Sequence, residues 1–294
     1  MQWIAYLLTR LIAEIFRFVP FRVLYALSDG LAFLLHRVVG YRKTVVHENL
    51  RRSFPEKKAD EIGEIATKFY RNLTDVMLET LKSYTMTIGE IQRRCPPRNP
   101  ELVNRYLDQG QSIILAGSHY NNWEYTGITL PPALHGTVVT AYKPLTNKRM
   151  DAYVNFTRAR TGMVLVSMEG TFTAIRQYER EQKPAVYILL ADQSPSSRKN
   201  AHWVTFLGQD TASLPGVDVL ARKFKLPVLY YHVRRLQRGF YDVEFFEVCP
   251  NPAEVAEAEI TRAYTRQLEN IIRERPENWL WSHKRWKMKR EVVK

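Results

Sequence analysis

Short apolar runs alternate with longer amphipathic stretches over most of the chain beyond residue 110. The runs that have the length and composition of buried strands cover residues 112–116, 137–141, 163–166, 185–190 and 227–233. Helix-like stretches occur near residues 122–132, 148–160, 170–182 and 215–225. Strands that alternate with helices are typical of a parallel sheet covered on both faces. The pattern predicts an α/β fold with a mixed, mainly parallel sheet flanked by helices, and residues 240–248 add an edge strand.

Other stretches frame the predicted sheet. Residues 56–82 carry apolar side chains near helical spacing, which predicts an amphipathic helix. Residues 95–100 contain three prolines and therefore form a connector. Residues 253–274 predict a long charged helix.

The first 39 residues are dense in large apolar side chains, but charges such as Arg10, Glu14 and Arg17 interrupt them. A membrane span needs about 18–20 apolar residues with few charges, and neither such a run nor a signal-peptide pattern is present. We expect two helical pieces, broken at Pro20, that associate with a membrane while their arginines snorkel. A single span and a pair of soluble core helices are the alternatives. Basic residues follow directly, which predicts a cytoplasmic location for this end.

Composition narrows the class of protein. Hydrophobic residues make up 45% of the 294, so the chain is not a disordered one. The two cysteines, Cys95 and Cys249, lie far apart, which excludes a disulfide scaffold and fits a reducing compartment. The formal net charge of +13 predicts an anionic partner: nucleic acid, an acidic protein or a phosphate-bearing membrane. We expect no nucleic-acid partner, because the charge is spread over many segments and no nucleic-acid module appears.

A group of reactive residues follows the first predicted strand, in the sequence GSHYNNWE at 117–124. Chemistry in such sheets gathers where strands end. His119 and Glu124 would face different sides of one helix, so they meet only if His119 lies in the loop and Glu124 in the first helical turns. An imidazole held by a carboxylate is oriented and more basic, which suits a general base for a hydroxyl group.

Three other interpretations of this segment stay open. A structural histidine near an unrelated glutamate is common by chance. A metal site is disfavoured, because a local third ligand is missing, and we expect no metal. A nucleophilic Ser118 would lack the Gly-x-Ser-x-Gly turn that exposes such a serine.

The segment 117–124 resembles the His-x4-Asp/Glu motif of glycerolipid acyltransferases, and its Asn-Trp-Glu ending is similar to the branch that adds secondary acyl chains to lipid A. Other parts of that branch follow in order along nearly the whole chain. They are Tyr-Lys-Pro at 142–144, Arg-Ala-Arg at 158–160, Ala-Asp-Gln-Ser-Pro at 191–195, Phe-Leu-Gly at 206–208 and a Trp/His/Arg-rich stretch at 279–286. Residues 168–171, Met-Glu-Gly-Thr, instead resemble a block of phosphatidic-acid-forming acyltransferases, without its flanking Phe-Pro and Arg.

The resemblance implies a glycerolipid-acyltransferase-like fold and transfer of an acyl group from a thioester, with acyl carrier protein as donor, to a hydroxyl of a lipid A precursor. It implies no cofactor, and it places the protein at the cytoplasmic face of the cell inner membrane. His119 is then the general base and Glu124 its orienting partner, while Arg160 or backbone N–H groups near Gly117 face the oxyanion. The residues expected to bind or shape the site for substrate are Asn122, Trp123, Lys143, Arg158, Arg160, Asp192 and Gln193.

On this basis the chain divides into a hydrophobic membrane-associating segment, residues 1–45, and an acyltransferase domain, residues 46–294. The tail from residue 281 to 294 carries six Lys/Arg and one Glu together with Trp281 and Trp286. This composition predicts contact with anionic lipid, and a solvated tail is the alternative. Two other functions stay open: the same reaction on a lysophospholipid or aminoacyl lipid, and a non-catalytic basic protein that binds membranes.

Overall fold

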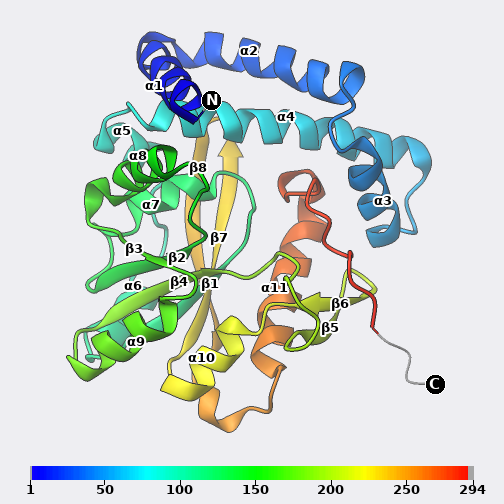
Figure 1. The fold of residues 1–294 in the computed structure, drawn as a ribbon. Coiled ribbons are helices and arrows are strands. Elements are labelled where there is room, and N and C mark those ends of the chain that lie inside the picture. The colour runs from blue at the N-terminus through cyan, green and yellow to red at the C-terminus, as the bar shows by residue number, and fades with distance from the viewer. Residues whose placement is uncertain (1, 291–294) are drawn as a thin grey trace.

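The computed structural model describes residues 2–290 and has a six-stranded sheet at its centre (Figure 1). The order across the sheet is β3-β2-β4-β1-β7-β8, in which the first five strands are parallel and β8 runs antiparallel to β7. The bounds are β1 (Ile113–Gly117), β2 (Thr137–Tyr142), β3 (Val164–Ser167), β4 (Ala185–Leu190), β7 (Val228–Gln237) and β8 (Phe240–Cys249). The predicted α/β class and its mainly parallel sheet are confirmed.

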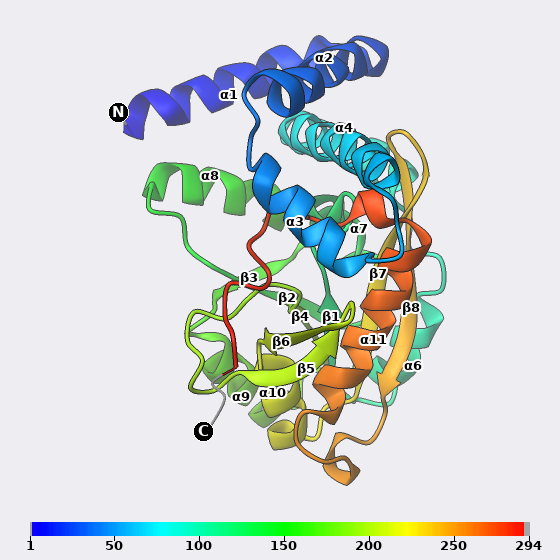
Figure 2. The same cartoon turned by 90° about the vertical axis from the view of Figure 1, so that its right-hand side faces the viewer.

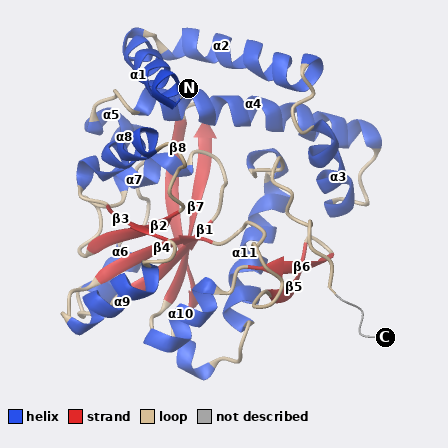
Figure 3. Ribbon diagram, viewed as in Figure 1, coloured by secondary structure: helices blue, strands red, loops and turns tan. Residues whose placement is uncertain are grey.

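Both faces of the sheet are buried, which explains why its strands are continuous apolar runs. In β1, Ile114 and Ala116 join one core while Ile113 and Leu115 join the other. The helices of the first core include α3 (Lys43–Ser53), α4 (Ala59–Ser83), α9 (Thr171–Arg180), α10 (Gly216–Phe224) and α11 (Glu259–Glu274). The second core contains α5 (Ile88–Arg94), α6 (Glu101–Leu107) and α7 (Thr126–Thr129). Figure 3 shows the sheet between these helical layers.

Two predicted elements differ from the structure. The helix expected at 122–132 is reduced to a 3-10 turn, Trp123–Tyr125, and the short α7, and a pair of prolines at 131–132 follows it. The helix expected from residue 253 begins only at Glu259, after a 3-10 turn at Pro252–Glu254. A two-stranded hairpin, β5 (His202–Phe206) and β6 (Gln209–Ser213), was not predicted.

The N-terminal helices α1 (Gln2–Phe18) and α2 (Phe21–Phe33) are separated at Pro20, as predicted, and a π-helical turn (Leu34–Val38) follows them. Both lie across α4 (Figures 1 and 2). The ammonium group of Lys82 in α4 donates to the carbonyls of Phe16 (2.6 Å) and Val19 (2.8 Å), which satisfies the free carbonyls at the end of α1.

Within the described residues no single helix is long and apolar enough to span a membrane. The segments 21–38 and 43–53 pass that test only as a pair bent by 87°. The predictions of membrane association and of a boundary at residue 45 therefore stay predictions.

The C-terminal segment differs from the predicted lipid-facing tail. Trp281 and Arg285 are buried, and the indole of Trp286 donates to Thr211 on β6 (2.8 Å). The prediction is wrong for Trp281, Arg285 and Trp286, because their side-chain N–H groups donate to partners inside the protein, while Lys284 is exposed. Residues 287, 289 and 290 are exposed, and residues 291–294 lie outside the described part of the chain.

Candidate active site

His119 lies in the loop that follows β1, and the C-terminal segment holds this loop from behind. Tyr120 and Trp279 form an antiparallel bridge, and the N–H of Leu280 donates to the carbonyl of His119 (3.2 Å). Asn121 has a left-handed backbone (φ 51°) and donates its N–H to the Asn278 carbonyl (3.0 Å). These contacts hold His119 in a loop ahead of the 3-10 turn that begins at Trp123.

Asp192 holds the imidazole of His119. It follows β4, which pairs with β1, so the two residues emerge side by side at the carboxyl edge of the sheet. The Nδ1 atom of His119 lies 2.7 Å from Oδ1 of Asp192. The other oxygen, Oδ2, accepts the backbone N–H of His119 (3.0 Å) and the indole N–H of Trp279 (2.9 Å). The Asp192 side chain is only 2% exposed, so these three donors replace water around it.

His119 and Asp192 each stabilise the charged form of the other. Burial alone would lower the pKa of His119, but the charge of Asp192 and its hydrogen bond outweigh burial and raise that pKa above its ordinary value. Burial would raise the pKa of Asp192, but the charge of His119 and the three hydrogen bonds keep it below its ordinary value. A carboxylate only accepts hydrogen bonds, so Nδ1 of a neutral His119 carries the proton and Nε2 is unprotonated and can accept.

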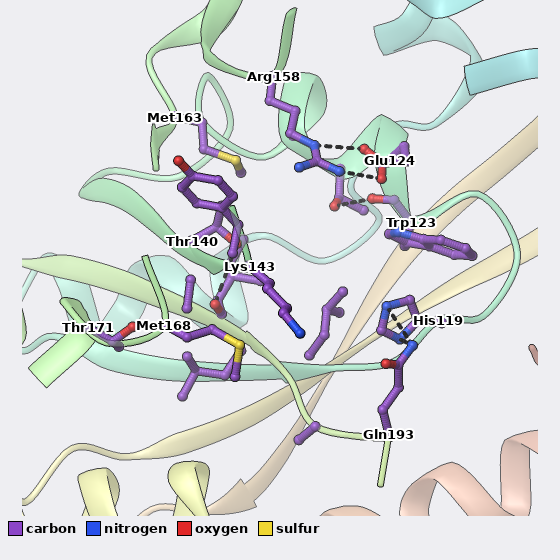
Figure 4. A pocket seen from close by; sticks show the side chains of 18 of the residues that line it. His119, Trp123, Glu124, Thr140, Lys143, Arg158, Met163, Met168, Thr171 and Gln193 are labelled. Carbon is purple, nitrogen blue, oxygen red and sulfur yellow. Dashed lines mark hydrogen bonds and ion pairs between the residues drawn. The ribbon is translucent and has the colours of Figure 1, made fainter. Parts of the chain in front are cut away.

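Glu124 does not orient His119, contrary to the prediction. Its carboxylate is held by both arms of the Arg158 guanidinium, with Nε–Oε2 at 2.9 Å and Nη2–Oε1 at 2.6 Å (Figure 4). The forked guanidinium matches the two carboxylate oxygens, which makes this a favoured pairing. The negative charge of Glu124 still adds a small rise to the pKa of His119, behind the contributions of Asp192.

A cavity of about 500 Å³ opens beside His119. Its polar wall carries Trp123, Lys143, Gln193 and the Glu124–Arg158 pair, as Figure 4 shows. Away from this wall the lining is mostly apolar. It is formed by side chains from β4, α10 and the loops around them, including Met168, Ile188, Leu189, Leu190, Leu214, Val217 and Leu220. The arrangement offers a basic imidazole at one end of a largely apolar chamber.

The structure brings six of the nine predicted site residues to this cavity. Asp192 is buried against His119 and does not line the cavity, and two residues lie elsewhere. Asn122 is buried away from the cavity and donates to the carboxylate of Glu79 (2.8 Å). Arg160 donates to the backbone carbonyls of Ser83 (2.7 Å) and Met86 (2.8 Å), so its guanidinium ties α4 to the turn after α8 (Lys148–Arg158). The predicted substrate contacts of Asn122 and Arg160, and the oxyanion role of Arg160, are therefore wrong.

Gln193 lies against the imidazole, with its Nε2 atom 3.3 Å from Nε2 of His119. The role of Trp279 as a donor to Asp192 was missed. The signal for it is the Trp/His/Arg-rich stretch at 279–286, which resembles part of the lipid A branch but assigns no role to Trp279. Among residues 2–290 no group of three His, Cys, Asp or Glu is placed to hold a metal ion.

Comparisons with known proteins identify the family of the chain. The family model described as bacterial lipid A biosynthesis acyltransferase matches residues 1–288. The chain is 24% identical to the lipid A biosynthesis lauroyltransferase of Escherichia coli K12, over 93% of this chain and 88% of that protein. It is 23% identical to a lipid A biosynthesis acyltransferase of Haemophilus influenzae (90% and 81%) and 21% identical to the lipid A biosynthesis palmitoleoyltransferase of E. coli K12 (91% and 86%). The chain therefore belongs to the bacterial lipid A biosynthesis acyltransferase family.

Proposed function

We propose that the protein transfers a fatty acyl group from the thioester of acyl carrier protein to a hydroxyl group of a lipid A precursor. The observation that carries this proposal is the imidazole of His119, whose Nδ1 is fixed by Asp192 beside a largely apolar cavity of about 500 Å³. Such a cavity suits a fatty chain, and the names of the lauroyl and palmitoleoyl transferases fit the same substrate class.

The chemical step uses His119 as a general base. Nε2 of His119 takes the proton of the acceptor's hydroxyl group, while the hydroxyl oxygen attacks the thioester carbonyl carbon. The C–O bond forms, the C–S bond breaks, and the departing thiolate takes the proton back from the imidazolium, which leaves an ester and a thiol. Asp192 stabilises the imidazolium that forms in between. A positioned base contributes roughly 10²–10⁴ to the rate, and alignment of hydroxyl and thioester contributes the larger part.

The polar wall of the cavity is the part that we assign to the anionic acceptor lipid. Lys143 follows β2 and its exposed ammonium group borders the cavity. An ammonium group at that position suits a phosphate on the acceptor. Because Glu124 holds Arg158, we propose that Arg158 chiefly shapes the polar wall and contributes to its charge.

The outer face of α1 is the surface that we assign to the membrane. Ile4, Leu8, Leu11 and Ile15 recur at helical spacing, and each is more than half exposed. The opposite face packs on the protein through Ala13, which is fully buried. An amphipathic helix of this kind lies in the plane of the lipid headgroups, which supports a location at a membrane surface. We assign this surface to the cytoplasmic face of the inner membrane because basic residues follow the segment directly.

Purified protein, the dodecanoyl thioester of acyl carrier protein and an extracted lipid A precursor test the transfer. Mass spectrometry should show one added acyl chain, and His119→Ala should abolish the product. The same donor with lysophospholipid or an aminoacyl lipid tests the other acceptors. Transfer to one of these alone would overturn the acceptor assignment, and unchanged transfer by His119→Ala would overturn the assigned base.

Vesicle flotation tests the membrane surface. Leu8→Gln with Leu11→Gln should weaken binding to anionic vesicles roughly 10- to 100-fold, because each leucine is about half exposed and would gain about half of the 1.5–3 kcal/mol that burial of a whole leucine contributes. Val219→Gln is the matched control, since it removes an equally exposed apolar side chain from α10, at the opposite end of the molecule (Figure 1). Equal binding by the double variant and the control would refute this surface.

A further inference from the structure

His283 contacts the catalytic loop from outside the cavity. Its Nε2 atom accepts the backbone N–H of Ser194 at 3.1 Å. Ser194 lies two residues after Asp192 and directly after Gln193, the two residues that contact the imidazole of His119. The contact therefore reaches the loop that carries the orienting carboxylate, although His283 does not line the cavity.

Before this point the chain is held by the Ala191 N–H, which donates to the Gly117 carbonyl (3.1 Å), and by the bonds to the Asp192 carboxylate; at Ser194 the side chain adds no such contact. The hydroxyl group of Ser194 is buried and has no hydrogen-bond partner among the described residues. The following Pro195 has no N–H to donate. The N–H group of Ser194 is thus the group of this residue that bonds the rest of the protein as the chain leaves Asp192 and Gln193.

His283 itself is firmly placed. Its carbonyl accepts the side-chain amide of Asn49 on α3 (2.9 Å), and its N–H donates to the Leu280 carbonyl (3.1 Å). Arg42 donates to the neighbouring Ser282 carbonyl (2.9 Å). Burial, together with the nearby Arg285, His119 and Lys287, lowers the pKa of His283 to about 4 although Asp192 opposes this shift. The ring is therefore neutral near pH 7, and Nε2 can accept a hydrogen bond.

We propose that His283 is a positioning residue for acyl transfer: by accepting the Ser194 N–H it sets the place of Asp192 and Gln193 against His119. The role differs from that of Trp279, which bonds the Asp192 carboxylate itself, because His283 acts only through the backbone of the loop. This inference rests on the proposed function. It adds that His119 and Asp192 need a third residue, His283, to be placed correctly for the reaction.

The variants His283→Gln and His283→Met form a matched test. Both side chains are unbranched and similar in length, but only glutamine offers an acceptor oxygen for Ser194. His283→Met should lower kcat between about 10- and 100-fold, as expected for a small displacement of a catalytic group, with the KM for dodecanoyl-acyl carrier protein changed less than about threefold. His283→Gln should restore most of the lost rate. His135→Gln, at an exposed histidine paired with Asp108, is the control and should keep the wild-type rate.

A second measurement needs no substrate. NMR titration of ¹³C-labelled histidines reports the pKa of His119, which the facing carboxylates of Asp192 and Glu124 raise. In His283→Met this pKa should move down, and in His283→Gln it should stay near the wild-type value. If His283→Met does not fold, Ser194→Pro removes the same hydrogen bond from the other side and should give the same shift.

The outcomes separate the two proposals. Wild-type protein without transfer activity would refute the proposed function, while the titration would still decide the role of His283. Active wild-type protein with equal kcat and equal His119 titration in the Gln and Met variants would refute the positioning role. Equal losses of kcat in both variants without a shift in the titration would also refute it, because that pattern indicates a packing role alone.

Discussion

Replacing Asp192 by asparagine tests which carboxylate serves His119. Three N–H donors converge on the two oxygens of Asp192: Nδ1 of His119 at 2.7 Å, the His119 backbone at 3.0 Å and the Trp279 indole at 2.9 Å. The amide of asparagine has one acceptor oxygen and an NH₂ group that cannot accept. At least one buried donor therefore loses its partner in the variant.

The expected effects follow from these contacts. An orphaned buried donor costs about 1–3 kcal/mol of the free energy of unfolding. The rate should fall by roughly 10²–10⁴, because the imidazole loses both its orientation and the charge that stabilises its protonated form. The pKa of His119 should also fall: burial lowers it, and the charge and hydrogen bond of Asp192 that overcome burial are gone. The acid limb of the kcat/KM profile should then move to lower pH.

The assay is acyl transfer from dodecanoyl-acyl carrier protein, measured from acid to neutral pH in wild type, Asp192→Asn and Glu124→Gln. In wild type, activity should drop as pH falls through the raised pKa of His119, since only the neutral imidazole accepts a proton. Glu124→Gln releases Arg158 and should lower activity, but it should shift the acid limb less than Asp192→Asn does. A wild-type rate and acid limb in Asp192→Asn, or a larger shift in Glu124→Gln, would refute the assignment of Asp192.

Two further substitutions probe the cavity. Gly117→Ala should destabilise the fold by about 1–3 kcal/mol in chemical denaturation, because the added Cβ overlaps the buried ring of Tyr231, which also lines the cavity; Gly63→Ala, with open space around the position on α4, should not, and similar midpoints for the two would contradict the argument. Leu220→Trp fills apolar volume on the α10 side and should shift the preferred thioester toward shorter acyl chains in competition assays. An unchanged preference would show that the acyl chain lies elsewhere.

The strands could be predicted from the sequence because a parallel sheet buried on both faces leaves continuous apolar runs. All six strands of the main sheet were expected at nearly the observed positions. The β5–β6 hairpin was not, because β6 reads Gln-Asp-Thr-Ala-Ser and lacks the apolar content of a strand. The helix at 122–132 is shorter than predicted for another reason: Pro131 and Pro132 lack the N–H groups that would continue it, and α7 ends at Thr129.

The candidate site also has one part that the sequence predicts and one part that it does not. His119 could be found because chemistry gathers at the end of a buried strand. Its carboxylate partner could not, because the choice between Glu124 and Asp192 depends on which strand lies beside β1. The strand order places β4 there, and with it a residue 73 positions away. Glu124, close in sequence, is instead drawn to Arg158 on α8.

The C-terminal segment shows why composition alone misplaces a basic, tryptophan-rich stretch. Tryptophan and basic residues suit both a lipid surface and a buried segment that bonds other parts of the protein. The partners of their side-chain N–H groups decide which of the two applies. The indole of Trp281 donates to the Pro276 carbonyl (2.6 Å), and Arg285 donates to the Ser213 hydroxyl (2.8 Å). The neighbouring Trp279 bonds Asp192, so this segment completes the catalytic pair and its removal would strip the carboxylate of a buried donor. A C-terminal truncation designed to weaken membrane binding would therefore act on the active site first.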